Sequence, residues 1–225
     1  MKIHTIPLGI DNCCLLEGER CVFIDGGALN QSRAFVKGMG ALGIAPSKVA
    51  LVILTHAHWD HIGSVHALVE LTGAKLAVHT GERDIIERGL KSMPPGVTVW
   101  GAIFGAILGA FLHFIVVPPT HVDIEIGDDG LSLEPYGVPG RVVYTPGHSP
   151  GSVIIVLDSG EAFVGDLAMN GLPLTRGPDL PIFAEDMGMV KESWRKLLKL
   201  GVTTVFPAHG RPFPVSVMER RLAAA

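Results

Sequence analysis

Short apolar runs bounded by glycine, proline or polar residues recur along the whole chain. Runs of about four to eight residues, rich in β-branched side chains or alternating with polar ones, predict β-strands. In the first half they lie at residues 2–8, 13–18, 21–27, 49–54 and 75–79, and in the second half at residues 131–135, 141–147, 152–157, 161–166 and 203–210.

Apolar residues at helical spacing separate several of these runs. They predict helices over residues 30–43, 62–73, 81–90 and 189–201, and a last short helix over residues 218–225. Gly73 stands where a glycine commonly ends a helix. Strands with helices interspersed among them indicate an α/β or α+β fold built in layers.

One segment departs from this alternation, because residues 97–117 carry almost nothing polar except Thr98 and His113. The segment is long enough to span a bilayer. Gly101, Gly105 and Gly109 repeat at the four-residue spacing that permits close contact between a helix and its neighbour. The pattern predicts a helix whose surroundings are apolar.

Composition narrows the classes of protein that remain. With 225 residues, 48% of them hydrophobic, the chain can bury a substantial core. A net charge of −4 supplies no basic surface, so we expect neither a nucleic-acid partner nor a polybasic membrane patch. Three cysteines, two of them adjacent, are predicted to be buried thiols, and no signal-peptide pattern opens the chain. We therefore expect a cytoplasmic protein.

Strong metal ligands crowd the end of the apolar run 49–54. The stretch THAHWDH contains His56, His58, Asp60 and His61. In an extended segment, residues two apart point to the same face, so His56 and His58 can reach one ion. Asp60 and His61 follow where the chain turns into a helix and can reach a second point. Imidazole and carboxylate together suit zinc, iron or manganese.

Three later strands end in the same way. RVVYTPGHSPGS contains His148, EAFVGD ends at Asp166, and TTVFPAHG contains His209. Each residue alone has an ordinary structural explanation, but their joint occurrence after buried strands predicts a metal centre. Seven ligands exceed the four of a tetrahedral ion and suit two ions that share a carboxylate.

These motifs carry a family resemblance. THAHWDH, TPGHSPGS, FVGD and FPAHG resemble the signature of the metallo-β-lactamase-fold hydrolase superfamily, and DNCCLLEGERCVFIDGG is similar to its N-terminal strand pair. The match extends from about residue 3 to residue 212 and points to the glyoxalase II or lactonase-like branch. It implies a single domain over residues 1–225, folded as an αββα four-layer sandwich, with an apolar insertion at about 96–118.

The resemblance also implies roles for individual residues. His56, His58 and His148 would bind one divalent ion; Asp60, His61 and His209 would bind a second, and Asp166 would bridge the two. Asp25 matches the aspartate that orients a ligand histidine in the family. Zinc is the expected metal, with iron or manganese as alternatives.

The chemistry expected of such a centre is hydrolysis. A water held by two divalent ions loses its proton near neutral pH and can attack an ester, lactone or thioester carbonyl. Asp60 is the candidate proton shuttle to the leaving group. Two alternatives remain open: a persulfide-dioxygenase-like enzyme with one iron held by His56, His148 and Asp166, and a metal-binding member of the superfamily without catalytic activity.

The ligand set also limits what residues 97–117 can be. A single membrane pass there would put His56 and His61 on one side of the membrane and His148 and His209 on the other, so no common site could form. We expect a helix that is not transmembrane and that serves as a lid over the site, as a homodimer interface, as a membrane-surface helix or as core. A lid predicts a small-molecule substrate with an apolar part.

Overall fold

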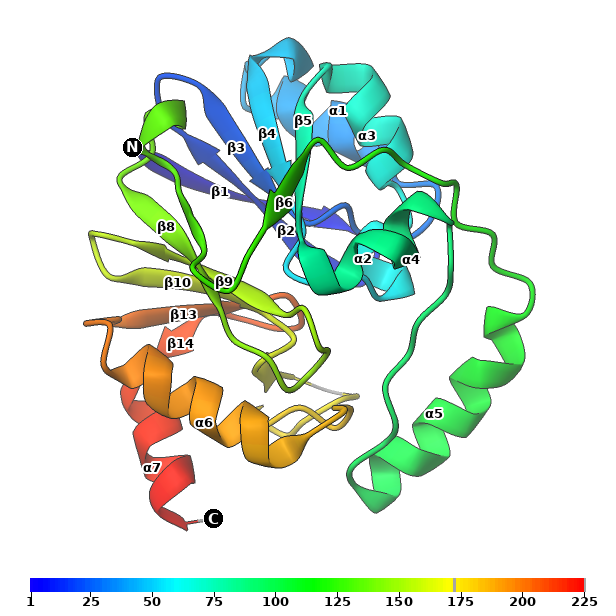
Figure 1. Ribbon diagram of the computed structural model, residues 1–225, viewed down its shortest axis with the longest axis vertical. Helices are drawn as coiled ribbons and strands as arrows, with labels where there is room; N and C mark the ends of the chain where they lie inside the picture. Colours follow the sequence, from blue (N-terminus) through cyan, green and yellow to red (C-terminus); the bar gives the residue numbers. More distant parts are fainter. Residues whose placement is uncertain (172, 225) are drawn as a thin grey trace.

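Two six-stranded sheets pack face to face in the computed structural model of the chain, which describes residues 1–171 and 173–224 (Figure 1). Helices cover the outer face of each sheet, so the layers follow the order helix, sheet, sheet, helix. The αββα architecture expected from the sequence is therefore confirmed.

The first sheet comes from the N-terminal half of the chain. Its strands, in spatial order, are β1 (Lys2–Leu8), β2 (Asp11–Glu17), β3 (Cys21–Ile24), β4 (Val49–Ile53), β5 (Lys75–His79) and β6 (Ile124–Ile126). Strands β1 to β3 are antiparallel, whereas β3 to β6 are parallel. Parallel strands direct their carboxyl ends to one edge, which here is the edge that carries the polar loops.

The second sheet comes from the C-terminal half. Its strands, in spatial order, are β14 (Phe213–Pro214), β13 (Thr204–Pro207), β10 (Glu161–Gly165), β9 (Val153–Leu157), β8 (Gly140–Tyr144) and β7 (Leu131–Ser132). Strands β10 and β13 are parallel, and the other neighbours are antiparallel. Strands β11 (Met169–Asn170) and β12 (Pro178–Asp179) form a separate two-stranded antiparallel sheet.

Some of the helices pack on the outer faces of the two sheets. The helices are α1 (Ser32–Ala41), α2 (Trp59–Ile62), α3 (Val65–Thr72), α4 (Arg83–Glu87), α5 (Val99–Leu112), α6 (Met187–Leu198) and α7 (Ser216–Ala224), with 3₁₀ turns η1 (Pro46–Lys48), η2 (Thr80–Glu82) and η3 (Glu134–Tyr136). Helices α1 and α3 pack Phe35 and Leu68 against the first sheet. Helix α6 packs Trp194 against the second. Apolar side chains of both sheets, such as Ile53 and Ile155, meet in the middle layer.

The element boundaries show where the sequence pattern stops being informative. Strands β6, β11, β12 and β14 were not predicted, because each has only two or three residues and forms only by pairing with a neighbouring strand. The run expected at residues 131–135 forms a two-residue strand followed by a 3₁₀ turn. The last helix is longer than predicted, beginning at Ser216, while Ala225 lies outside the described residues.

The apolar segment forms helix α5, which stands away from the sandwich in Figure 1. Thr98 begins the helix, since its side chain accepts a hydrogen bond of 2.9 Å from the Gly101 amide. Beyond Leu112 the chain passes through a turn into backbone without regular secondary structure. The helix is therefore shorter than the segment 97–117, and within residues 1–171 and 173–224 no helix is long and apolar enough to cross a membrane.

Candidate metal centre

The first group of candidate ligands lies at the carboxyl end of β4. Thr55 lies two residues beyond that strand and is followed by His56 and then by His58, whose backbone is extended. The short helix α2 then begins directly after His58 and carries Asp60 and His61 inward, where both are buried. The turn of α2 thus brings His61 beside His56, with the two ring centroids 4.0 Å apart.

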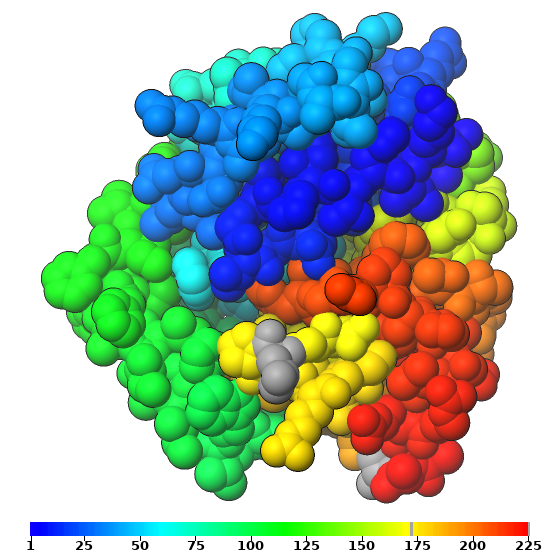
Figure 2. Space-filling model, turned by 180° about the vertical axis from the view of Figure 1, so that it is seen from behind, coloured from blue at the N-terminus to red at the C-terminus, as the bar shows by residue number. Residues whose placement is uncertain are grey.

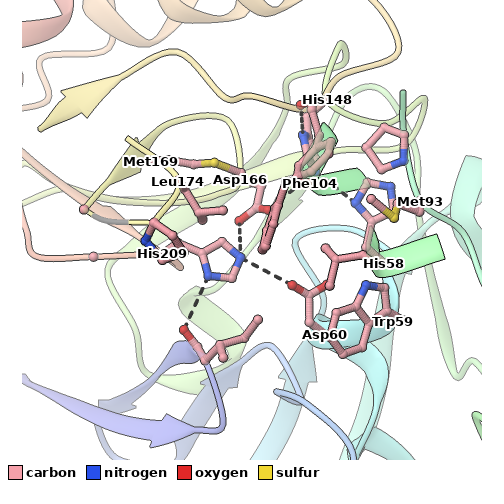
Figure 3. A pocket seen from close by; sticks show the side chains of 17 residues that line it. His58, Trp59, Asp60, Met93, Phe104, His148, Asp166, Met169, Leu174 and His209 are labelled. Atoms are coloured by element: carbon pink, nitrogen blue, oxygen red, sulfur yellow. Dashed lines mark hydrogen bonds and ion pairs between the residues drawn. The ribbon is translucent and has the colours of Figure 1, made fainter. Parts of the chain in front are cut away.

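The second sheet supplies the remaining candidates. His148 lies in the loop between β8 and β9, Asp166 directly follows β10, and His209 lies two residues beyond β13. Because the two sheets stack with these loops at the same edge, all seven predicted residues lie in one buried cluster between the sheets. Figure 3 shows His148, Asp166 and His209 facing His58 and Asp60 across this cluster.

Three imidazoles form one potential ion site. The nitrogens of His56, His58 and His148 lie within 4.8 Å of one another, close enough to share an ion. His58 Nδ1 and His148 Nε2 are only 2.9 Å apart. Burial lowers the pKa of all three imidazoles, most strongly for His56 and His58, and so favours the neutral form in which imidazole binds metals.

A second potential site is rich in carboxylates. Atoms of Asp11, Asp60, His61 and His209 also lie within 4.8 Å of one another. Burial by itself lowers the pKa of His61 and His209, but the surrounding carboxylates outweigh it and raise both pKa values well above the usual range. This part of the cluster therefore attracts positive charge.

Asp166 lies between the two groups and faces both. Its Oδ1 is 3.4 Å from His61 Nε2 and 3.3 Å from His209 Nε2, whereas its Oδ2 is 3.7 Å from His148 Nε2. Burial by itself raises the pKa of Asp166, but the imidazoles of His209 and His61 hold it well below the usual range. The carboxylate is thus ionised and has one oxygen toward each group.

Neighbouring groups fix the orientation of the histidines. His56 Nδ1 lies 3.1 Å from Thr55 Oγ1, and His61 Nδ1 lies 3.1 Å from Asp25 Oδ2. His148 Nδ1 lies 2.8 Å from the Phe183 carbonyl oxygen. Each Nε2 is left for the centre of the cluster. A partner at the other ring nitrogen is how metal-binding histidines are commonly held.

The residues fit bound cations, as their unpaired atoms show. Within the described residues, most buried side-chain nitrogens and oxygens without a hydrogen-bond partner belong to this cluster: Asp11 Oδ1, Asp11 Oδ2, His56 Nε2, His58 Nε2, His61 Nε2 and Asp166 Oδ1. Buried polar atoms are normally paired, and buried carboxylates pair with cations. The described residues that line the adjoining cavity include no lysine or arginine. Divalent ions are the chemical group that this donor set suits.

Comparison with known proteins agrees with this geometry. The sequence profile of the family described as the Metallo-beta-lactamase superfamily matches residues 6–209. The chain belongs to this superfamily. A relative from Sulfurisphaera tokodaii, named Metallo-beta-lactamase fold-containing protein ST1585, is 28% identical over 98% of this chain and 82% of its own length. The Bacillus subtilis protein named Probable metallo-hydrolase YqgX is 27% identical over 76% of this chain and 73% of its own length.

Solved structures give the same fold. The BLEG-1 B3 metallo-beta-lactamase superimposes with a TM-score of 0.71 at 24% identity, over 96% of this chain and 95% of that one. TTHA1623 in a di-iron-bound form superimposes with a TM-score of 0.67 at 25% identity, over 97% of this chain and 98% of that one. The superfamily includes hydrolases, and none of these likenesses selects a branch or a substrate for this member.

Two buried carboxylates of this superfamily member were missed by the sequence reasoning. Asp11 lies at the β1–β2 turn, where the neighbouring glycine and asparagine suggest only turn chemistry. Glu82 ends the 3₁₀ turn after β5, and its Oε1 accepts hydrogen bonds of 2.6 Å from Ser149 Oγ and 2.8 Å from the Gly151 amide. Glu82 thus holds the loop that carries His148. No periodicity marks either residue, because their burial arises from contacts with distant segments.

A cavity of about 460 Å³ opens onto the cluster. Its floor contains His58, Asp60, Asp166 and His209, and its walls are mostly apolar (Figure 3). The apolar lining residues are Ile10, Trp59, Met93, Pro94, Phe104, Leu108, Met169, Pro173, Leu174 and Phe183. Helix α5 contributes two of them, Phe104 and Leu108, so the apolar segment 97–117 borders the candidate metal centre.

The apolar segment 97–117 is tied to the loop that orients His148. The Val97 amide donates to the Ile182 carbonyl at 2.9 Å, and the next carbonyl along the chain, that of Phe183, lies 2.8 Å from His148 Nδ1. Gly101 makes the close approach possible, since a Cβ there would lie 2.2 Å from the Ile182 oxygen. Helix α5 is therefore anchored next to a candidate ligand.

Asp25→Asn tests how strongly the metal centre depends on the orientation of His61. Asp25 accepts from the Thr55 amide at 2.7 Å and lies 3.1 Å from His61 Nδ1. The amide keeps the shape but presents a donor or a weaker acceptor to the imidazole. We expect metal affinity, measured by competition with a chromophoric chelator, to fall by about 10–100-fold. Asp158→Asn, at an exposed carboxylate, is the matched control. Equal affinities in the two variants would contradict the positioning role.

Proposed function

We propose that the chain is a hydrolase that holds two divalent ions and cleaves an ester, lactone or thioester bond in a small substrate with an apolar part. The observation that carries this proposal is the position of Asp166, with one oxygen toward an all-imidazole group and the other toward a carboxylate-rich group. Members of both groups, including His58 and His209, line a cavity whose walls are mostly apolar.

The assignment of ligands follows the two groups. His56, His58 and His148 would hold the first ion, Asp60, His61 and His209 the second, and Asp166 both. Three imidazoles suit zinc, and iron or manganese are the alternatives, particularly at the second position. One structural relative, TTHA1623, has been solved in a di-iron-bound form.

Bound ions would supply the acidity that converts water into a nucleophile and the positive charge that stabilises an oxyanion. The chain itself would position the reactants. Asp60 lines the cavity, and its Oδ2 lies 3.4 Å from His209 Nε2, so it is the candidate to carry a proton to the leaving group. The apolar walls would exclude bulk water and strengthen these electrostatic interactions.

The position of helix α5 is an argument for a substrate with an apolar group. Phe104 and Leu108 project toward Phe183 and Met169 in a small hydrophobic cluster that forms one wall of the cavity. A wall of this kind can bury an acyl chain beside the reacting carbonyl, and each buried methylene contributes about 0.8 kcal/mol. We therefore infer a preference for acyl groups longer than acetyl.

The opposite side of α5 suggests an oligomer. Val99, Ile103, Ile107 and Phe111 recur every fourth residue and are all more than half exposed. Such a stripe is rarely left bare in water. We propose that a second copy of the chain covers it, and sedimentation velocity at micromolar concentration distinguishes this homodimer from a monomer.

The single-iron dioxygenase is the weaker alternative. It requires only His56, His148 and Asp166 as ligands, so it gives no role to the buried group of Asp60, His61 and His209. A metal-binding protein without catalysis gives no role to the cavity above the ions. The two-ion hydrolase accounts for all of these features.

The proposed activity is tested with metal-loaded wild-type protein and the Asp166→Ala variant on a panel of esters, lactones and thioesters. We expect turnover by the wild type and a loss of at least about a hundredfold in kcat for the variant, since weakening even an indirect metal contact costs 10–100-fold. Asp158→Ala, at an exposed position, serves as the control. Full turnover by a folded Asp166→Ala protein would rule out the bridging role.

A chain-length series tests the acyl preference. We expect kcat/KM of the wild type to rise by up to about fourfold for each added methylene that is buried. Phe104→Ala should flatten this rise because it removes part of the cavity wall, whereas Phe111→Ala, on the exposed side of the same helix, should not. A flat series in the wild type would show that α5 does not select the acyl group.

A further inference from the structure

Asp11 is a buried carboxylate without a hydrogen-bond partner. Asp11 is the first residue of β2 and is 1% exposed. Within residues 1–171 and 173–224, neither of its oxygens has a hydrogen-bond partner. Burial raises the pKa of Asp11 well above its usual range, because the ionised form is costly here unless a cation or several donors compensate it. The position therefore calls for a positive charge next to Asp11.

Distances place Asp11 at the second potential ion site. Its Oδ1 lies 3.3 Å from His209 Nε2 and 3.9 Å from His61 Nε2. Two atoms that each bind an ion at roughly 2.1 Å lie at most about 4.2 Å apart. Both separations fall inside this limit, so Asp11 can share an ion with the two histidines.

A hydrogen bond to His209 does not explain the arrangement. His209 Nε2 is surrounded at similar distances by three carboxylate oxygens: 3.3 Å to Asp11, 3.4 Å to Asp60 and 3.3 Å to Asp166. One N–H can serve one acceptor well, and it cannot satisfy three. Three carboxylates around two imidazole nitrogens are what a cation at their centre would bring together.

The backbone holds Asp11 in this place. The amide of the next residue, Asn12, donates to the Ala208 carbonyl at 2.8 Å, and its side-chain amide donates to the Gly210 carbonyl at 2.7 Å. The β1–β2 hairpin is thereby fastened to the loop on both sides of His209. Figure 2 shows the blue N-terminal strands lying against this orange segment. Asp11 and His209 thus come from opposite sheets but occupy a fixed relative position.

We propose that Asp11 is a further ligand of the second ion, in addition to Asp60, Asp166, His61 and His209. This inference rests on the two-ion centre proposed above. Three carboxylate oxygens and two imidazole nitrogens make five donors, more than a tetrahedral zinc site uses. A set so rich in hard oxygen ligands suits an ion of higher coordination number, such as Mn²⁺ or Fe²⁺. The two ions would then differ in kind, with zinc held by the three imidazoles.

Metal titration of Asp11→Asn tests the inference without an activity assay. The ion-free protein is loaded with one equivalent of Zn²⁺, and Mn²⁺ is then titrated while free Mn²⁺ is counted by electron paramagnetic resonance. A parallel titration uses Zn²⁺ as the second ion. We expect wild type to take up one further ion per chain. In Asp11→Asn this second affinity should fall at least about tenfold, while the first stays unchanged.

Asp129→Asn, at an exposed carboxylate, is the matched control and should bind as wild type does. Thermal unfolding of the ion-free proteins separates ligation from a structural role. A ligand that is otherwise unpaired should leave ion-free Asp11→Asn at least as stable as ion-free wild type. If Asp11 instead stabilises the fold through the two histidines, the ion-free Asp11→Asn variant should have a lower Tm than ion-free wild type.

The outcomes distinguish this inference from the proposed function. Wild-type affinity for the second ion in Asp11→Asn overturns the role of Asp11 and leaves the two-ion hydrolase standing. A lower Tm in the ion-free variant with unchanged second-ion affinity assigns Asp11 a structural role instead. A wild-type chain that takes up no second ion overturns both proposals. A weakened second site in Asp11→Asn supports Asp11 as a ligand whether or not a substrate has been found.

Discussion

The charge balance of one buried cluster is the constraint on which the rest of the structure depends. Asp11, Asp60 and Asp166 bring three carboxylates into a space that solvent barely reaches, and within the described residues of the cavity wall no lysine or arginine compensates them. The carboxylates raise the pKa values of His61 and His209, against the effect of burial, so these two imidazoles take up part of the positive charge. Divalent ions would resolve this imbalance and would also join the two sheets, since the candidate ligands come from loops of both.

The same edge of the sandwich also carries the cavity through which a substrate would reach the candidate metal centre. Helix α5 is anchored at Gly101 against the chain that orients His148, so the apolar wall of the cavity and the candidate ligands share a support. The close approach requires glycine at the N-terminal end of the helix, because a Cβ on Gly101 would clash with the Ile182 carbonyl. At the other end, a Cβ on Gly109 would meet nothing within 4 Å. Under the proposed function, chemistry and substrate choice would be separable. The candidate ligand loops would set the chemistry, while helix α5, which lines the cavity, would contact the substrate.

The candidate site could be predicted from the sequence to the extent that its residues follow buried strands. His56, His58, His148, Asp166 and His209 each come just after an apolar run, and the sandwich brings those strand ends together. Asp11 could not be found in this way, because its burial depends on Asn12 contacting the His209 loop nearly 200 residues later in the chain. The three-residue strand β6 escaped prediction for a similar reason, since it forms by pairing with β5. Local patterns predicted the elements and most candidate ligands, and they failed where a residue's environment is made by distant chain.

The central claim is that this chain binds two divalent ions in one buried centre. Elemental analysis of purified wild-type protein, loaded with excess metal and then dialysed extensively against metal-free buffer, tests it most directly when combined with an accurate protein concentration. We predict two ions per chain. One ion or none would contradict the two-ion centre, because the two ligand groups facing Asp166 would then not both be occupied.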